Sequence, residues 1–497
     1  MAAFEWGKEH LGMEKAMELL EMSSLPPLGP EALKRLKDSR AHVEKVLESE
    51  HSHYGINTGF GPLCDTQVSA EQSGQLQQNL LLSHAVGVGS PVAMELSKLM
   101  LICKIHALCR GYSGVRITLV ERLYLFLEKD WIPVVPEQGS VGASGDLAPL
   151  SHLFLPLIGE GEFWVNGQRR PAAEVLKEAG VAPMQLSGKE GLALINGTQF
   201  ILAHTLKGLD KMTYLLDLAD LAAAMTLEGY QGSGSPFHEG LHQCRPFAGS
   251  QLVAARMREM LAGSENLASH ADCARVQDPY SIRCIPQVHG ASRNAYAHLK
   301  ELAEIESNSV TDNPLVFSAS EIISGGNFHG QPLAMALDYA TVAASELGNI
   351  SDRRSYLLLE GRYGLPRFLT KKEGLHSGMM IPQYTTAALV SENKSLCFPS
   401  SADSIPTSLG QEDHVSMGSI SGRKFMQVLG NLEKILAIEI LMASQALEFR
   451  RPLRFSEKIE QNLSLVRQNV APLEEDRLLK PDIDALIHLV RTRQFTI

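Results

Sequence analysis

The decisive stretch of this chain is Gly139-Ser140-Val141-Gly142-Ala143-Ser144-Gly145-Asp146-Leu147-Ala148-Pro149-Leu150-Ser151-His152. Within it, Ala143 and Gly145 flank Ser144 with the smallest side chains available. The amide nitrogen of Gly145 can therefore approach the carbonyl carbon of Ala143, because glycine tolerates a compressed turn. If that nitrogen attacks with loss of water, and Ser144 also loses its hydroxyl, the product is a five-membered methylidene-imidazolone (MIO) ring with an electrophilic methylene.

A helix is expected to begin just after this tripeptide. Asp146 is a good N-cap residue, and Pro149 is tolerated only in the first turn of a helix. The positive end of that helix would point toward the ring and make its methylene more electron-poor. The alternative is a glycine- and serine-rich surface loop that caps an ordinary helix, and an isolated Ala-Ser-Gly would favour that alternative.

Length and composition indicate a globular protein. The 497 residues predict two to four domains or one large helical assembly, with 44% hydrophobic and 20% charged residues. The net charge of -11 argues against nucleic acid as a partner. No segment has the uninterrupted apolar length of a membrane helix, and the charged N-terminus lacks the apolar core of a secretory signal.

The cysteines predict reduced thiols. There are seven, at Cys64, Cys103, Cys109, Cys244, Cys273, Cys284 and Cys397. The odd count, the wide spacing and the absence of a Cys-x-x-Cys pair are typical of a cytosolic protein and not of a disulfide framework. We therefore expect a cytoplasmic location.

Two segments before the central stretch contain further candidate site residues, one in a glycine-rich loop and one after an apolar run. The segment from His53 to Gly61 contains three glycines in its last seven residues, which favours a loop near a site. Its Tyr54, taken alone, would more often be a packing aromatic. Ser83 and His84 follow an apolar run, where a lone histidine is more often a satisfied core residue.

The segments after the central stretch are mostly helical in pattern. An Asn166-Gly167 turn between short apolar segments predicts a hairpin, the clearest β signal of the chain. A long helical pattern opens near Asn196, which could cap the helix, and extends through Glu228. Another long pattern runs from Gly418 to Arg450. Its core positions are Leu429, Leu432, Ile435 and Leu436.

A second distinctive stretch reads Gln277-Asp278-Pro279-Tyr280-Ser281-Ile282-Arg283. The planar guanidinium of an arginine can pair with both oxygens of a carboxylate. Tyr280 and Arg283 are three residues apart, so they lie on the same side if this segment is a helical turn. The alternative for Arg283 is an ordinary surface ion pair.

Glu412 belongs to the sequence Gln411-Glu412-Asp413-His414, which is expected to form a loop before the last long helix. A carboxylate there can accept a hydrogen bond from an imidazole, whereas a phenyl ring has no such group to offer. Glu412 is therefore a candidate residue for binding an imidazole. The alternative is one more solvated acid.

Three of these motifs resemble signatures of the histidine and aromatic amino acid ammonia-lyases. They are the run from Gly142 to His152, the Tyr-Gly-x-Asn-Thr-Gly-Phe-Gly pattern at Tyr54, and the Gln-Asp-x-Tyr-x-x-Arg pattern at Gln277. Matching motifs extend to about Glu448 and so cover most of the chain. The resemblance implies a mainly α fold, a long-helix bundle of the aromatic amino acid lyase type with minor β hairpins. It also implies a homotetramer in which each active site gathers residues from more than one chain.

The same resemblance implies a role for each candidate residue. Ala143, Ser144 and Gly145 would form MIO autocatalytically, with no metal or dissociable cofactor, while Tyr54 would remove the β-proton and Tyr280 would donate a proton or orient the leaving amine. The residues expected to bind substrate are His84, Asn196, Gln277, Arg283, Phe328 and Glu412. Arg283 and Asn196 would hold the carboxylate, and His84 and Glu412 would orient the imidazole.

The choice of substrate depends on the residues around its ring. Ser83-His84 and Glu412 resemble the histidine enzymes and predict that L-histidine is converted to trans-urocanate and ammonia. Phe398, Leu409 and Gly410 depart from the usual histidine pattern. The alternative within the family is therefore a tyrosine or phenylalanine ammonia-lyase, or an aminomutase.

Outside the family, the alternatives are a fumarase-like helical lyase without a prosthetic ring, a silent helical scaffold and a metal hydrolase. The intact Ala-Ser-Gly tripeptide, together with Tyr54 and Arg283, argues against a silent scaffold, and the absence of a His-Glu-x-x-His motif argues against the hydrolase. We expect two domains: residues 1–195 with the Tyr54 and Ala-Ser-Gly loops, and residues 196–497 with the helix bundle and a C-terminal helical region. The expected partners are a small amino acid and further copies of the chain, without nucleic acid or membrane.

Overall fold

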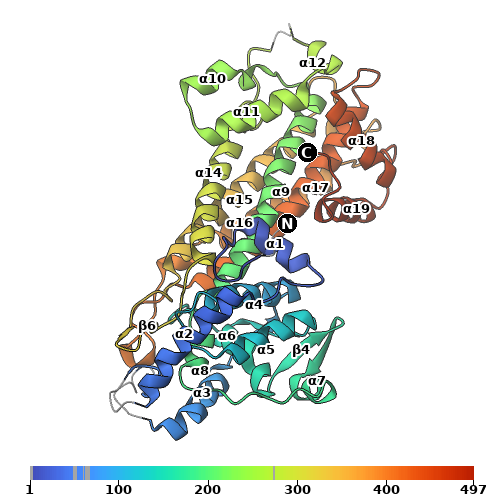
Figure 1. Ribbon diagram of the computed structural model, residues 1–497. Coiled ribbons are helices and arrows are strands. Elements are labelled where there is room, and N and C mark those ends of the chain that lie inside the picture. The colour runs from blue at the N-terminus through green and yellow to red at the C-terminus, as the bar shows by residue number, and fades with distance from the viewer. Residues whose placement is uncertain (1–3, 49–52, 60, 62–67, 272–274) are drawn as a thin grey trace. The chain divides into compact units, whose positions relative to one another are not determined.

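The computed structural model describes residues 4–48, 53–59, 61, 68–271 and 275–497. Helices dominate these residues, and the strands form only small sheets (Figure 1). The prediction of a mainly α fold with long helices and minor β hairpins is therefore confirmed. Among the described residues, no helix is both long enough and apolar enough to span a membrane.

The chain divides into two compact units, each assembled from separate segments. Unit 1 comprises Met1–Asp210, Leu299–Asp338 and Pro399–Arg423, and unit 2 comprises Lys211–His298, Tyr339–Phe398 and Lys424–Ile497. Four of the five boundaries between the units fall inside long helices, namely α9 (Gln199–Tyr230), α14 (Ile285–Ser307), α15 (Gln331–Leu358) and α17 (Gly418–Glu448), and the fifth lies between Phe398 and Pro399. The expected division into consecutive domains, 1–195 and 196–497, stays a prediction.

Unit 1 combines short helices with small antiparallel sheets. Its helices are α1 (Met13–Glu21), α2 (Pro30–Leu47), α3 (Ala70–His84), α4 (Met94–Leu108), α5 (Ile117–Glu128), α6 (Leu147–Phe154), α7 (Ala172–Glu178) and α8 (Glu190–Ile195), with 3-10 turns at Leu155–Ile158, Ser400–Ala402 and Ser408–Gly410. Its strands are β1 (Val88–Pro91), β2 (Ile132–Pro133), β3 (Pro136–Gln138), β4 (Glu162–Val165), β5 (Gln168–Pro171), β6 (Leu315–Ser318) and β7 (Glu321–Ile323). β1 pairs with β3, β4 with β2 and β5, and β6 with β7.

The predicted hairpin is formed by β4 and β5. Val165 pairs with Gln168, so Asn166 and Gly167 are the two central residues of the turn. Their φ angles are +50° and +75°, the backbone of a two-residue hairpin turn that asparagine and glycine adopt most readily. The local turn chemistry is sufficient to explain this element.

Two capping predictions need correction. Helix α6 begins at Leu147 as expected, but the Asp146 carboxylate makes no capping hydrogen bond to it. One carboxylate oxygen instead accepts the backbone N–H groups of Phe200 and Ile201 at the start of α9, each at 3.0 Å. Asn196 is the C-cap residue of α8 and does not cap α9, which begins at Gln199. For Asp146, a tertiary contact replaces the local one.

Unit 2 contains the remaining helices, the C-terminal parts of α9, α15 and α17, and the N-terminal part of α14. These helices are α10 (Glu239–Cys244), α11 (Ala248–Leu261), α12 (Glu265–Ala268), α13 (Tyr280–Arg283), α16 (Met380–Leu396), α18 (Glu457–Asn469) and α19 (Lys480–Arg491), with 3-10 turns at Ser235–Phe237 and Arg367–Leu369. The predicted helix from Gly418 to Arg450 is α17. The apolar residues predicted for its core are fully buried, namely Leu429, Leu432, Ile435 and Leu436.

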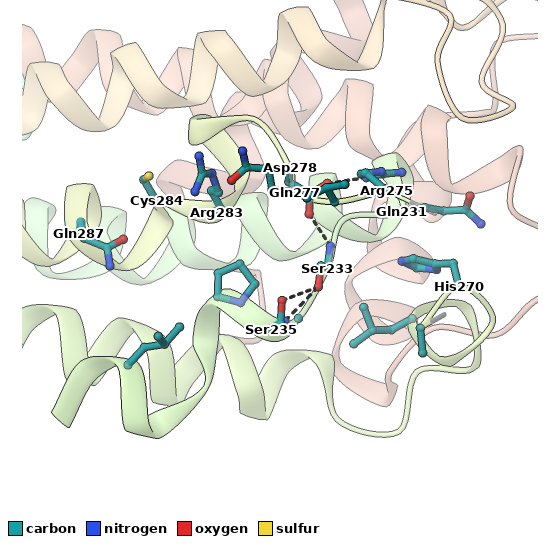
Figure 2. Close-up of a pocket in the computed structure, with 16 residues that line it drawn as sticks. Gln231, Ser233, Ser235, His270, Arg275, Gln277, Asp278, Arg283, Cys284 and Gln287 are labelled. Carbon is teal, nitrogen blue, oxygen red and sulfur yellow. Dashed lines mark hydrogen bonds and ion pairs between the residues drawn. The ribbon is translucent and has the colours of Figure 1, made fainter. Parts of the chain in front are cut away.

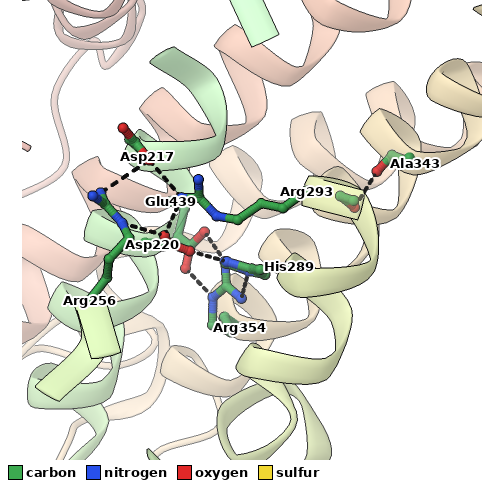
Figure 3. A network of polar contacts seen from close by, with 9 residues as sticks. Asp217, Asp220, Arg256, His289, Arg293, Ala343, Arg354 and Glu439 are labelled. Carbon is green, nitrogen blue, oxygen red and sulfur yellow. Dashed lines mark hydrogen bonds and ion pairs between the residues drawn. The ribbon is translucent and has the colours of Figure 1, made fainter. Parts of the chain in front are cut away.

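A buried polar network connects helices within unit 2 (Figure 3). The guanidinium of Arg354 donates to both carboxylate oxygens of Glu439, at 2.6 and 2.9 Å, and both residues are fully buried. His289 contacts Arg354 at 3.2 Å and Asp220 at 2.8 Å. Burial opposes ionisation of Asp220, but its hydrogen bond with His289 and two nearby arginines hold its pKa below the ordinary value. The buried charges are therefore paired.

Candidate active site

Most of the predicted site residues meet at one cavity of unit 1. Its volume is about 910 Å³. Seven of the predicted residues line it, namely Tyr54, His84, Ala143, Ser144, Asn196, Phe328 and Glu412. They come from segments spread over most of the sequence, and Gly145, the next residue after Ser144, is buried. The structure therefore brings together the predicted electrophile, the predicted base and most of the predicted substrate contacts.

The Ala-Ser-Gly loop is held in a conformation that requires glycine. Gly142 and Gly145 have φ angles of +69° and +81°. A Cβ atom on Gly145 would lie 2.2 Å from the carbonyl oxygen of Gly197, so no other residue fits there without a backbone shift. The N–H of Asp146 donates to the same carbonyl oxygen at 2.8 Å. The loop is thus pressed against the segment that connects α8 to α9.

Asp146 connects this loop to α9 and is completely buried. Burial raises the pKa of its carboxyl group to about 7, although the N–H groups of Ile201 and Phe200 favour the charged form. On its other side, the loop contacts the segment before α17. The N–H of Met417 donates to the carbonyl oxygen of Val141 at 3.0 Å, and Ala143 packs with Val415 and Met417.

Glu412 lies next to the Ser144 hydroxyl in the wall of the cavity. This hydroxyl donates to Oε1 of Glu412 at 2.9 Å. Oε2 accepts hydrogen bonds from the hydroxyls of Thr407 and Ser408, at 2.8 and 3.0 Å. Three hydroxyl groups therefore fix the orientation of this carboxylate. Glu412 is not the freely solvated acid of the alternative interpretation.

The segment next to Glu412 has an unusual backbone. Ser408, Leu409 and Gly410 have φ angles of +50°, +56° and +85°. For non-glycine residues this region is strained, and such strain is found most often at functional sites. Leu409, one of the departures from the histidine pattern, is 96% exposed and does not line the cavity.

Tyr54 lies on the predicted glycine-rich loop. Its hydroxyl accepts a hydrogen bond from the N–H of Gly61 at 3.3 Å. Asn57 stabilises the same loop, because its side-chain oxygen accepts the N–H of His53 at 2.7 Å. Phe60, also part of this motif, lies outside the described residues. Tyr54 is half-buried and lines the cavity.

His84 is the last residue of α3 and lines the same cavity. Its Nδ1 lies 3.0 Å from the hydroxyl oxygen of Ser83. Burial lowers the pKa of His84 below its ordinary value of 6.5, and the backbone of Leu80 and the charge of Glu412 oppose this only partly. The imidazole is therefore neutral at pH 7 and can both donate and accept a hydrogen bond.

The depressed pKa of His84 leads to a pH prediction. Below pH 6.5 the unfolded chain binds more protons at this position than the folded chain, so the His84 contribution to stability is lost as the pH falls through the folded-state pKa. We expect the wild-type protein to lose thermal stability relative to His84→Gln as the pH is lowered from 7 to 5. Thermal unfolding of both proteins over this range measures the effect, and a difference that stays constant with pH would contradict it.

Gln277, Tyr280 and Arg283 do not line this cavity. They belong to unit 2, where Gln277 and Arg283 line a second cavity of about 800 Å³ (Figure 2). Tyr280 to Arg283 form the single-turn helix α13, and the Arg283 guanidinium lies over the Tyr280 ring at 4.6 Å, which confirms that the two residues share one side. Nε of Arg283 is buried, and no hydrogen-bond partner for it exists within the described residues. Asp278 anchors the segment by accepting the N–H of Ser233 at 2.6 Å.

The residues of the Ala-Ser-Gly loop fit an MIO group. Cyclisation requires the Gly145 nitrogen to reach the Ala143 carbonyl carbon, and Gly145 already has a positive φ that suits the compressed turn and that only glycine adopts readily. The Ser144 hydroxyl, which would be eliminated, lies in the cavity and not in the core. Among the described residues, no group of three or more histidines, cysteines or acids is arranged to hold a metal ion.

The sequence did not indicate every residue near the cavity. Asn313, His329 and His414 also line it, and the rings of His329 and His414 stack at 5.5 Å. Lys104 is buried in α4 and donates to the carbonyl oxygen of Asn196, which lines the cavity, at 2.6 Å. A lysine in a mostly apolar segment of a helix was the available signal, because such a residue needs buried partners.

Comparison with known proteins agrees with this geometry. A family model described as aromatic amino acid lyase matches residues 12–468. A histidine ammonia-lyase of Symbiobacterium thermophilum is 48% identical, over 99% of this chain and 97% of its own. The crystal structure of a histidine ammonia-lyase from Trypanosoma cruzi is 42% identical with a TM-score of 0.90, covering 98% of this chain and 92% of that one. The structure of tyrosine aminomutase from Streptomyces globisporus is 35% identical with a TM-score of 0.93, covering 99% and 98%. With a match over nearly its whole length, this chain belongs to the aromatic amino acid lyase family.

Proposed function

We propose that this chain is a histidine ammonia-lyase, which eliminates ammonia from L-histidine and gives trans-urocanate. The main support is the contact between Ser144 and Glu412 in a cavity that His84 also lines. This arrangement places a carboxylate and a neutral imidazole beside the predicted electrophile, and both can hydrogen-bond to an imidazole substrate. Relatives named histidine ammonia-lyase, at 48% and 47% identity, support the same choice.

We infer that Ala143, Ser144 and Gly145 cyclise to MIO. When formed, this group supplies an electron sink that assists the departure of ammonia. Tyr54, which lines the same cavity, takes the β-proton of the substrate. A general base in the correct position contributes typically about 100- to 10,000-fold to a rate. Asn196 binds the substrate carboxylate or amine, and Phe328 packs against the bound amino acid.

We also infer that the active site is completed by a neighbouring subunit of a homotetramer. Gln277, Tyr280 and Arg283 would come from that neighbour, because within one chain they lie outside the Ser144 cavity. The buried, unpartnered Nε of Arg283 supports a ligand there, since buried N–H groups are nearly always hydrogen-bonded. Arg283 would clamp the substrate carboxylate, Gln277 would bind near it, and Tyr280 would serve the leaving amine.

The carboxylate clamp leads to a prediction about substrate affinity. Arg283→Ala is expected to raise KM for L-histidine by roughly 100-fold, because the loss of one partner of a buried charge pair costs several kcal/mol. Arg245→Ala, at an exposed position of the same unit, is the matched control. Steady-state kinetics of both variants provide the measurement, and an unchanged KM in Arg283→Ala would remove this residue from the clamp role.

The alternative is a tyrosine or phenylalanine enzyme of the same family, either a lyase or an aminomutase. Phe398 favours it, because an aromatic residue replaces the histidine usual at this position. The likeness to a tyrosine aminomutase structure keeps this alternative open.

Side-by-side assays with L-histidine, L-tyrosine and L-phenylalanine test the proposal. The conjugated acrylate product is followed by its ultraviolet absorption, and the intact mass of the subunit reports ring formation as a loss of two waters. Activity with histidine alone is expected. Activity with tyrosine or phenylalanine, and none with histidine, would overturn the substrate but leave the electrophile in place.

We further propose a cytoplasmic location. The described cysteines are all free thiols, namely Cys103, Cys109, Cys244, Cys284 and Cys397, whereas Cys64 and Cys273 lie outside the described residues. Free thiols are typical of a reducing compartment.

A further inference from the structure

Lys104 is buried and forms no ion pair with any of the described residues. It lies on α4, in which the residues from Leu99 to Leu108 are nearly all inaccessible to solvent, and only 2% of Lys104 itself is exposed. Its ammonium nitrogen donates to the carbonyl oxygens of Ala193 at 3.0 Å and Asn196 at 2.6 Å. These hydrogen bonds connect α4 to the C-terminal end of α8.

The two carbonyl groups belong to the end of a helix. The last four carbonyls of a helix have no partner within it, and a cation near them is favoured by the helix dipole. Ala193 lies in the last turn of α8, and Asn196 is its C-cap residue with an extended backbone. Lys104 therefore donates hydrogen bonds to two carbonyl groups that have no partner within α8. These hydrogen bonds hold the C-terminal end of the helix in position.

The end of α8 determines the position of two parts of the active site. Asn196 lines the cavity, and Gly197, the next residue, forms a bridge with Gly145. The carbonyl oxygen of Gly197 accepts the N–H of Asp146 at 2.8 Å. A displacement of the α8 end would therefore move both the Asn196 side chain and the surface against which the Ala-Ser-Gly loop is pressed.

The charges around Lys104 are consistent with a positioning role. Burial lowers the pKa of this lysine to about 7, with Asp312 and Asp146 opposing the shift and Lys189 adding to it. Lys189 forms an ion pair with Asp312 at 2.6 Å, so that acid already has a partner. The direct hydrogen bonds of Lys104 are to the two carbonyls, and it does not line the cavity.

We propose that Lys104 is a positioning residue, which holds the end of α8 so that Asn196 can bind substrate and Gly197 can support cyclisation of the Ala-Ser-Gly loop. This inference rests on the proposed function and adds a residue that touches neither substrate nor ring. Because Lys104 acts through backbone carbonyl groups, its replacement should lower both the completeness of ring formation and the rate of turnover.

The test compares Lys104→Met with two controls on the same helix. Methionine keeps the length of the side chain and removes the donors. Leu99→Ala destabilises α4 by creating a cavity at a fully buried position, and Lys98→Met removes a lysine that pairs with Asp130 at 3.6 Å. Each protein is examined by intact mass, by steady-state kinetics with L-histidine and by thermal unfolding.

We expect many Lys104→Met subunits to retain the mass of both waters, and kcat/KM to fall by roughly 100-fold, the scale of a small displacement in an active site. Leu99→Ala should lose at least as much thermal stability, yet complete its ring. Complete dehydration of Lys104→Met, with kcat/KM equal to that of Leu99→Ala, would overturn the proposal. If Lys104→Met does not fold, Lys104→Gln, a shorter donor, replaces it and is judged by the same comparison. If the wild-type protein neither loses two waters nor acts on histidine, the proposed function itself fails.

Discussion

Ser144→Ala is expected to abolish ammonia release while the protein still folds and assembles. Alanine has no hydroxyl to eliminate, so the methylene of MIO cannot form. Removal of a single electrostatic donor from an active site often costs about 100- to 1000-fold in kcat, and the loss of the whole electrophile should cost at least that much. The measurements are the initial rate with L-histidine and the intact mass, which should lack the loss of two waters.

The matched control is Ser151→Ala. Ser151 lies on α6, just after the Ala-Ser-Gly loop, and its buried hydroxyl donates to the Leu81 carbonyl oxygen at 2.6 Å. Its removal should lower the stability by about 1–3 kcal/mol and leave the ring intact. Near-wild-type turnover by Ser144→Ala would refute the prosthetic-group proposal, whatever the stability of either variant.

Local chemistry explains which features the sequence predicted well. The Asn166-Gly167 hairpin depends on two neighbouring residues, and the core face of α17 depends on helical periodicity. The Ala-Ser-Gly loop was predicted from the resemblance of the run from Gly142 to His152, and its small side chains only permit the compressed turn. Its strongest constraint, however, is the Gly197 carbonyl, which lies against Gly145 but is distant in the sequence.

Tertiary contacts explain what the sequence did not predict. Asp146 has a favourable capping position, yet its carboxylate binds the start of α9 because two N–H groups there need an acceptor. The role of Lys104 could not be predicted from its mostly apolar helical segment, since its carbonyl partners are distant in the sequence. The resemblance supplied Arg283, but sequence spacing cannot show that it lines a different cavity from Ser144.

The buried network of unit 2 leads to the largest stability prediction. Arg354→Met is expected to lower the free energy of unfolding by about 3–5 kcal/mol, because it leaves a buried carboxylate without its counter-charge. Among the described residues, Glu439 would retain as donors only the hydroxyls of Thr226 and Ser351, at 2.9 and 2.6 Å. Urea unfolding at one fixed protein concentration gives the measurement, since subunit association also shifts the apparent stability.

The double variant Arg354→Met/Glu439→Leu separates the loss of an ion pair from the loss of packing. If the single variant is unstable because of an unpaired charge, the removal of that charge should restore much of the stability, as apolar replacements of buried pairs often do. Arg362→Met is the surface control: Arg362 pairs with Glu360 at 2.9 Å but is 57% exposed, so its loss should cost at most about 1 kcal/mol. A double variant no more stable than Arg354→Met would show instead that the shape of Arg354, and not its charge, stabilises this part of unit 2.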